Sequence, residues 1–213
     1  MKALMNKEFK LVANPLFFLV PLLSALILIP QWVFFVALLY FCFMGAPNLF
    51  ILAKNYKEVY FSATQPVSRR EIVRARMYTL ITLEVLQLLV AAICVAVRLI
   101  WWRQANFFMD ANLAFLGLSF VMFGLFNVIM APMFYKTAYK IAIPVIVATV
   151  AATLFAGAVE VGVILVPFLA AFFDGIRTTW QHIVTLLGGI AIFVVLNIAA
   201  YRMSARRFET LDL

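Results

Sequence analysis

Long apolar runs, separated by short polar stretches, constrain the fold of this chain more than any other feature of its sequence. Hydrophobic residues occupy 67% of the 213 positions, which is more than a water-soluble domain of this length can bury. A helix needs about 20 apolar residues to cross a bilayer core of about 30 Å. We therefore expect an all-α membrane protein, a single transmembrane domain over residues 1–213, with six spans at residues 11 or 15–29, 32–53, 78–100, 113–134, 141–160 and 183–201.

The fifth apolar run is too long for one span. Residues 141–173 would measure about 50 Å as a single straight helix, which overshoots the hydrocarbon core. Gly157, Gly162 and Pro167 are available to interrupt this helix. We expect a span that ends near Glu160, followed by a short re-entrant or interfacial hairpin on the outer side; the alternative is one long tilted helix.

Basic residues distinguish the two sides of the predicted bundle. All but three of the 17 lysines and arginines fall on the side that holds both termini, the exceptions being Arg98, Arg103 and Arg177. Cytoplasmic segments of membrane proteins carry the excess of Lys and Arg. The pattern predicts a multi-pass protein of a cell membrane with both termini in the cytoplasm. A bilayer accounts for the net charge of +8, so we expect no nucleic-acid partner.

A helix start is encoded between the second and third spans. Ser68 and Glu71 have the S-x-x-E spacing of a capping box, in which each side chain bonds the other residue's backbone N–H. Val67 and Ile72 are placed for a hydrophobic staple across the same cap. We expect a helix that begins at Arg69 and continues into the third span, preceded by a short helix on the membrane surface.

This region resembles a known family. An apolar span, a short aromatic and polar helix, "QPVSRREIVRAR" and another span follow one another as in the membrane subunits of ABC-type exporters with six spans and no fused ATPase. The family shows a segment like "LPVSRREIV"; this chain departs from it at Gln65. The opening "MKALMNKEFKL" and the end "SARRFETLDL" are also similar. Within the family, the likeness is greatest to exporters of phenol-soluble modulins, which are amphipathic cytolytic peptides.

The resemblance implies a partner and a mechanism. It implies a bacterial dimer of identical or paralogous permeases, with two separate ATPase subunits that bind ATP and Mg, and an amphipathic peptide as cargo. The chain contains no G-x-x-x-x-G-K-[ST] phosphate loop, so we expect no cofactor in it. The loop would couple to the ATPase through Lys57, Glu58, Tyr60, Ser62, Gln65, Ser68, Arg69, Arg70 and Glu71. The alternative is a solvated loop that only fixes topology.

The first residues have the pattern of an amphipathic helix. One face carries apolar side chains and the opposite face carries polar ones: Leu4, Met5, Phe9 and Val12 against Lys2, Asn6 and Lys10. We interpret this segment as an interfacial elbow helix that braces the transporter. The alternative is a basic segment that simply leads into the first span.

Polar residues recur along one stripe of the third span. Glu84, Gln87, Ala91 and Arg98 are separated by helical spacings, and ionisable groups at membrane depth usually face an interior or a water-filled path. We assign Glu84, Gln87 and Arg98 to a translocation path, with Glu84 and Arg98 too far apart to pair. The alternative is hydrogen bonding between helices, or snorkelling at the helix ends.

Small residues recur in the fifth span. Ala148, Ala152 and Ala156 are four apart, with Glu160 next on the same face, and such spacing allows close approach of two helices. The stripe predicts either the dimer interface or packing within one subunit. We expect His182, beside Trp180, to lie in the outer loop at headgroup level.

Enzyme functions lack the residues that they need. The chain has one histidine and shows no Ser/His/Asp set, Cys/His set or H-E-x-x-H motif, so we expect no catalytic residue and no metal site. Two other classes stay open. One is a secondary transporter or channel, in which Glu84 and Glu160 would carry protons; the other is a membrane assembly or regulatory subunit.

Overall fold

The described part of the chain is helical throughout. The computed structural model describes residues 15–55, 68–101, 106–137, 140–176 and 179–210, and no strand occurs among them. Its elements are α2 (Pro15–Leu22), η1 (Leu23–Leu28), α3 (Phe35–Tyr40), η2 (Phe41–Gly45), α4 (Ala46–Asn55), α6 (Arg69–Trp101), α7 (Leu113–Tyr135), α8 (Ala142–Leu165), α9 (Pro167–Phe173) and α10 (Trp180–Glu209).

Five segments are long and apolar enough to cross a membrane. They are Phe35–Leu52, α6, α7, α8 and α10, and the described residues add one shorter apolar helix, Leu19–Leu28. The first of the five combines α3, the π-helical η2 and α4, and agrees with the span expected at residues 32–53. α7 agrees with the span expected at 113–134. For the described residues, the expectation of an all-helical fold with several candidate membrane spans is therefore confirmed.

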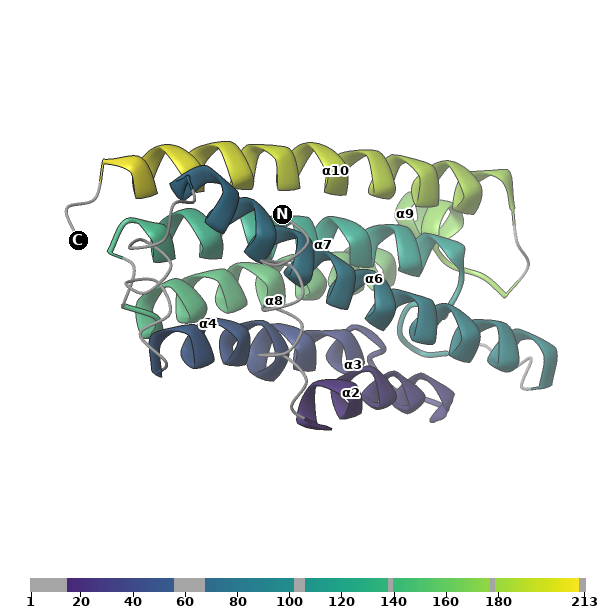
Figure 1. Cartoon of the computed structure of the whole chain (residues 1–213). Helices are drawn as coiled ribbons and strands as arrows, with labels where there is room; N and C mark the ends of the chain where they lie inside the picture. The colour runs from purple at the N-terminus through teal and green to yellow at the C-terminus, as the bar shows by residue number, and fades with distance from the viewer. Residues whose placement is uncertain (1–14, 56–67, 102–105, 138–139, 177–178, 211–213) are drawn as a thin grey trace.

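The helices lie side by side in one bundle. α10 runs along α7, α7 packs on α8, and α6 crosses beside them toward η1 (Figure 1). T-shaped aromatic pairs join the second span to α7: Phe35 with Phe115, Phe41 with Phe123, and Phe50 with Phe134. All these rings are buried, so the core runs along the centre of the bundle.

Two glycines bring α7 and α10 into backbone contact. A Cβ atom added to Gly189 would collide with the carbonyl group of Gly117, and one added to Gly117 would lie 2.7 Å from the Cα of Leu186. Real Cβ atoms do not approach backbone this closely, so only glycine fits at either position. This contact fixes the spacing of the two helices.

The predicted break in the fifth apolar run occurs, but not at Glu160. α8 continues to Leu165, and Val166 adopts an extended conformation with φ −112° and ψ 105°. Pro167 then starts α9. A glycine costs a helix only about 1 kcal/mol, whereas proline removes a backbone donor and clashes with the preceding turn. The expected end near Glu160 is thus wrong by five residues, and Gly157 and Gly162 are helical.

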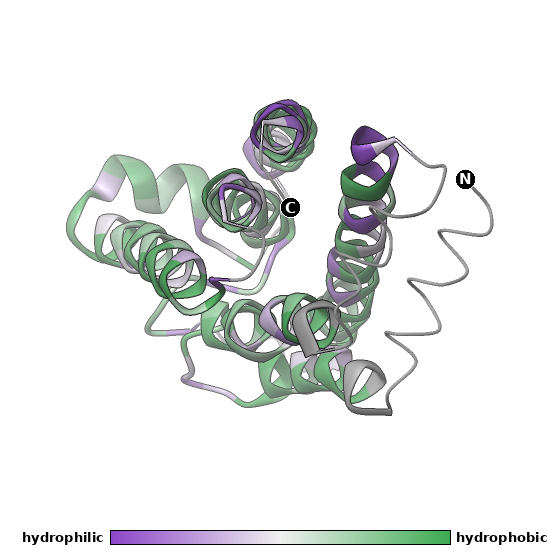
Figure 2. Ribbon diagram, turned by 60° about the vertical axis from the view of Figure 1, so that its left-hand side comes forward, coloured by the Kyte–Doolittle hydropathy of each residue, from purple (hydrophilic) through white to green (hydrophobic). Residues whose placement is uncertain are grey.

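Basic side chains gather at one end of the bundle, which we call the basic end. It is formed by the end of α4, the start of α6, the end of α7, the start of α8 and the end of α10 (Figure 1). In Figure 2 the hydrophilic colour is strongest at the start of α6 and on α10, whereas most of the remaining ribbon is hydrophobic. Among the residues whose exposure the structure describes, the exposed basic ones at this end are Arg70, Arg74, Lys136, Lys140, Arg202, Arg206 and Arg207.

Candidate functional site

The capping box at the start of α6 is confirmed. The backbone N–H of Glu71 donates to Oγ of Ser68 at 3.3 Å, and the backbone N–H of Ser68 donates to Oε2 of Glu71 at 3.2 Å. The Ser68 hydroxyl also donates to that carboxylate oxygen at 3.0 Å. These bonds satisfy two donors that a helix start leaves open, so α6 begins at Arg69 as expected. Val67, the other half of the staple, lies outside the described residues.

Residues 68–71, which we call the capped corner, form hydrogen bonds with the end of α10. Nη1 of Arg69 donates to the carbonyl oxygens of Phe208 and Glu209, at 3.0 and 3.1 Å. Arg70 forms an ion pair with the Glu209 carboxylate, with Nη2 3.1 Å from Oε2. Both side chains of this pair are exposed. The pair is therefore stabilised more by its two parallel hydrogen bonds than by burial. The start of α6 and the end of α10 are therefore held together.

Most of the predicted coupling residues cannot be placed. Lys57, Glu58, Tyr60, Ser62 and Gln65 lie outside the described residues, as does the expected elbow helix with its seven named positions. Ser68, Arg69, Arg70 and Glu71 are described, and all four belong to the capped corner or to its link with α10. Their proposed contact with an ATPase stays a prediction.

A polar network crosses the centre of the bundle. Nδ2 of Asn127, on α7, donates to Oε2 of Glu84 on α6 at 2.8 Å and to Oδ1 of Asn197 on α10 at 2.9 Å. The Asn197 amide donates in turn to the carbonyl oxygen of Phe193 at 3.0 Å. Glu84 and Asn127 are fully buried. Oε1 of Glu84 has no hydrogen-bond partner among the described residues, which is costly in an apolar interior.

The rest of the predicted stripe on α6 also faces the interior. Nε2 of Gln87 donates to Oγ of Ser24 at 2.9 Å, and Nη1 of Arg98 lies 3.4 Å from the carbonyl oxygen of Ile27. The Arg98 guanidinium also lies 4.8 Å from the centre of the Phe34 ring. Glu84 and Arg98 thus have separate partners. Hydrogen bonding between helices, the alternative interpretation, accounts for these contacts, and a translocation path along the stripe stays a prediction.

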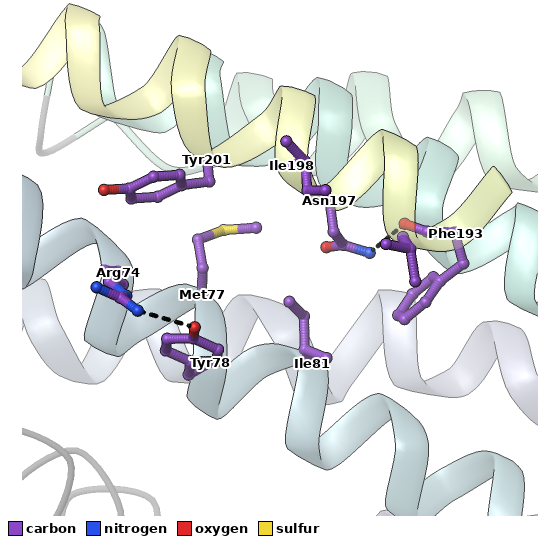
Figure 3. A pocket seen from close by; sticks show the side chains of 9 residues that line it. Arg74, Met77, Tyr78, Ile81, Phe193, Asn197, Ile198 and Tyr201 are labelled. Carbon is purple, nitrogen blue, oxygen red and sulfur yellow. Dashed lines mark hydrogen bonds between the residues drawn. The ribbon is translucent and has the colours of Figure 1, made fainter. Parts of the chain in front are cut away.

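The described cavity lies beside this stripe and not on it. It has a volume of about 350 Å³ and lies between α6 and α10, which contribute four and five lining residues, respectively (Figure 3). Of the polar network only Asn197 reaches it. Asn197 therefore connects the cavity with Glu84 through a single side chain, that of Asn127.

The alanine stripe of α8 is covered by the chain's own helices. Ala148 and Ala152 are completely buried, and Ala156 is 3% exposed. Packing within one subunit, the alternative to a dimer interface, accounts for this burial. The opposite face of α8 is exposed, with Ile143, Ile146, Val150 and Leu154 among its side chains.

Replacing Ala152 by leucine tests the two interpretations of the stripe. Three extra carbons would have to fit into a closed interior, so we expect the unfolding free energy of the subunit to fall by about 1–3 kcal/mol. The control is Ala158→Leu, on the exposed side of the same helix. Thermal unfolding of the purified subunit gives the answer. Normal unfolding combined with lost dimer on native electrophoresis would assign the stripe to the dimer interface.

Glu160 stabilises a loop at the end opposite the basic end. Its Oε2 accepts the backbone N–H of Met109 at 3.0 Å, and Oδ1 of Asp174 accepts that of Asp110 at 2.8 Å. The loop between α6 and α7 is thereby attached to α8 and to the residues after α9. Burial raises the pKa of Asp110, and the nearby Asp174 raises it further, although the N–H of Asn106 lowers it.

His182 corrects an expectation. It lies in the first turn of α10 and not in a loop, and it is fully buried, with Nε2 3.2 Å from the carbonyl oxygen of Asp174. It is therefore buried inside the protein, against the carbonyl group of Asp174, whereas the neighbouring Trp180 is 75% exposed.

Asn127 and Asn197 are the site residues that the sequence reasoning missed. Each is the single asparagine in its helix, and an amide in the middle of an apolar span is a signal for hydrogen bonding between helices. The signal was present but did not identify the partner, because the pairing depends on which helices are neighbours.

Long apolar helices around a buried polar network define a multi-pass membrane protein. Comparison with protein families goes further: the model of the ABC-2 family transporter protein matches residues 3–209, so the chain belongs to that family. The resemblance is confirmed to this extent, as the membrane subunit of an ABC-type transporter. No curated protein and no solved structure matches the chain.

Proposed function

We propose that this chain is the membrane subunit of an ATP-driven exporter in a bacterial cell membrane. It works as a dimer, with itself or a paralogous permease, and draws its energy from separate ATPase subunits. The cargo is an amphipathic or hydrophobic peptide. The observation that carries the proposal is the family match over residues 3–209. The likeness of "QPVSRREIVRAR" to peptide exporters supports the choice of cargo and direction.

The proposed topology has six spans, with both termini in the cytoplasm and one domain over residues 1–213. The first span combines Leu19–Leu28 with the apolar residues before it, and the residues before these form the elbow helix. α9, which follows the break at Pro167, belongs to the outer hairpin. The basic end faces the cytoplasm because that is where multi-pass proteins concentrate Lys and Arg.

The capped corner offers a way to couple the ATPase to the spans. A partner that pushes on the residues before Ser68 would move the start of α6 as a rigid piece, because the capping box closes it. Arg69 and Arg70 would pass the displacement to the end of α10. Movement of these two helices would change the cavity between them, and Asn197 would carry the change to Glu84.

Site-directed crosslinking tests the coupling assignment. Single cysteines at Ser62, Thr137 and Thr210, each labelled with a benzophenone maleimide, place a photoprobe in the predicted coupling loop, in the loop after α7 and in the tail. Cys42 and Cys94 are buried, which limits labelling elsewhere. In the native complex we expect the ATPase to be captured mainly from residue 62. Capture only from residues 137 or 210 would refute the assignment.

Co-purification tests the class of transporter. Isolation of the tagged chain from native membranes should recover an ATPase subunit in nearly equal amount. Recovery without such a partner would favour the secondary transporter or the assembly subunit.

A further inference from the structure

The cavity between α6 and α10 is a groove with an open side, which we call the α6–α10 groove. Its walls include side chains that are substantially exposed: Tyr78 is 41% exposed, and Val194 and Ile198 are each 48% exposed. In a protein surrounded by lipid, an opening between two spanning helices faces the acyl chains. A ligand could therefore enter it from the bilayer without crossing the protein.

The groove has a polar end that contains Arg74, and the rest of its lining is apolar except for Asn197. Arg74, Tyr78 and Tyr201 lie at one end, and Ile81, Ile198 and Phe193 lie toward the other (Figure 3). Nη2 of Arg74 lies 3.3 Å from the Tyr78 hydroxyl, which accepts its hydrogen bond and leaves the rest of the guanidinium exposed. The polar end is near the start of α6 and thus at the basic end.

We propose that the α6–α10 groove binds an anionic phospholipid. The phosphate is held by the Arg74 guanidinium and by the Tyr201 hydroxyl, and one acyl chain lies along Met77, Ile81 and Ile198. Arginine suits a phosphate because its N–H groups can make two parallel hydrogen bonds. Basic pockets between spanning helices on the cytoplasmic side have the chemistry to bind such headgroups.

Charge favours a lipid over a basic peptide as the occupant. The described carboxylates at this end are already engaged: Glu209 pairs with Arg70, and Glu71 accepts hydrogen bonds from Ser68, so the exposed Arg74 guanidinium is left to attract an anion. A cationic peptide would meet like charges at the groove's polar end, whereas a phosphate meets opposite ones. An acyl chain gains little by leaving other lipid for the groove, so selectivity must come from the headgroup.

Native mass spectrometry of the full chain in detergent tests the proposal, with palmitoyl-oleoyl phosphatidylglycerol and phosphatidylcholine as probes. The wild type should retain one phosphatidylglycerol with an affinity about tenfold higher than for phosphatidylcholine. Arg74→Gln should lose most of this preference. Arg202→Gln is the matched control, because it removes an exposed arginine at the same end that does not line the groove.

A second variant distinguishes lipid binding in the groove from lipid attraction by surface charge. Ile198→Trp fills the groove without changing charge, and it should weaken phosphatidylglycerol retention while the melting temperature stays unchanged, since Ile198 is exposed. Equal losses in Arg74→Gln and Arg202→Gln, or equal retention of the two lipids by the wild type, would overturn the proposal. So would a cationic amphipathic peptide that binds the wild type and is lost in Ile198→Trp while lipid retention is unaffected.

Discussion

Gly189→Ala is expected to destabilise the bundle severely, although it adds only one methyl group. The new Cβ would collide with the backbone of Gly117, and backbone cannot rotate away as a side chain can. α7 and α10 would have to separate along the contact that holds them together. We expect a loss of about 3 kcal/mol or more, at the upper end of what overpacking costs. Thermal unfolding in detergent and the yield of monodisperse protein would measure it.

The adjacent residue provides the control. A Cβ added to Gly188 meets no atom within 4 Å, so Gly188→Ala changes the same residue type in the same helix without a clash. Because alanine is the better helix former by about 1 kcal/mol, this variant should be neutral or slightly more stable. Equal melting temperatures for the two variants would show that the glycine contact does not set the distance between α7 and α10.

Features encoded within a few neighbouring residues could be predicted from the sequence. Ser68 and Glu71 contact each other across three positions, so the start of α6 followed from their spacing alone. A break after α8 was predicted, but five residues too early, because the two glycines were given the same weight as Pro167, at which the next helix begins. Apolar length located the spans but not the helix ends: α6 and α10 have 33 and 30 residues because their polar ends continue as helix beyond the apolar part.

Features that depend on neighbours in space could not be predicted. The spacing of Glu84, Gln87 and Arg98 identified an interior face, but not that Asn127, Ser24 and Ile27 would be their partners. The alanine stripe indicated close packing without saying which helix packs on it. Glu160 was the hardest case, because its bond to the Met109 backbone depends on the path of a loop 51 residues away.

Glu84→Gln is expected to impair transport while leaving the fold nearly intact. Glutamine keeps the size of the side chain and retains an oxygen that can accept the Asn127 amide, so the link between α6 and α7 survives. The variant lacks only the ionisable group. A carboxyl group buried at membrane depth is expensive and marks a functional position by default. Asn127 and Asn197 connect Glu84 to the α6–α10 groove. A movement of α6 relative to α10 would therefore change the surroundings of its carboxyl group.

The measurement compares function with stability in the same samples. In the reconstituted complex, export or cargo-stimulated ATP hydrolysis should fall about tenfold, which corresponds to about 1.4 kcal/mol. The melting temperature and the yield of the complex should change little. Glu84→Leu is the companion variant: it removes the acceptor, leaves the buried Asn127 amide with only its bond to Asn197, and should lower stability by about 1–3 kcal/mol.

The pair of variants distinguishes a transport residue from a packing residue. If Glu84 only holds helices together, Glu84→Gln and Glu84→Leu should differ in stability, and neither should reduce transport per folded complex. If the ionisable group takes part in the transport cycle, both should lose transport, and only the leucine variant should also lose stability. Unchanged transport in Glu84→Gln would therefore show that Glu84 has only a structural role. It would then act with Asn127 and Asn197 to fix the register of α6, α7 and α10.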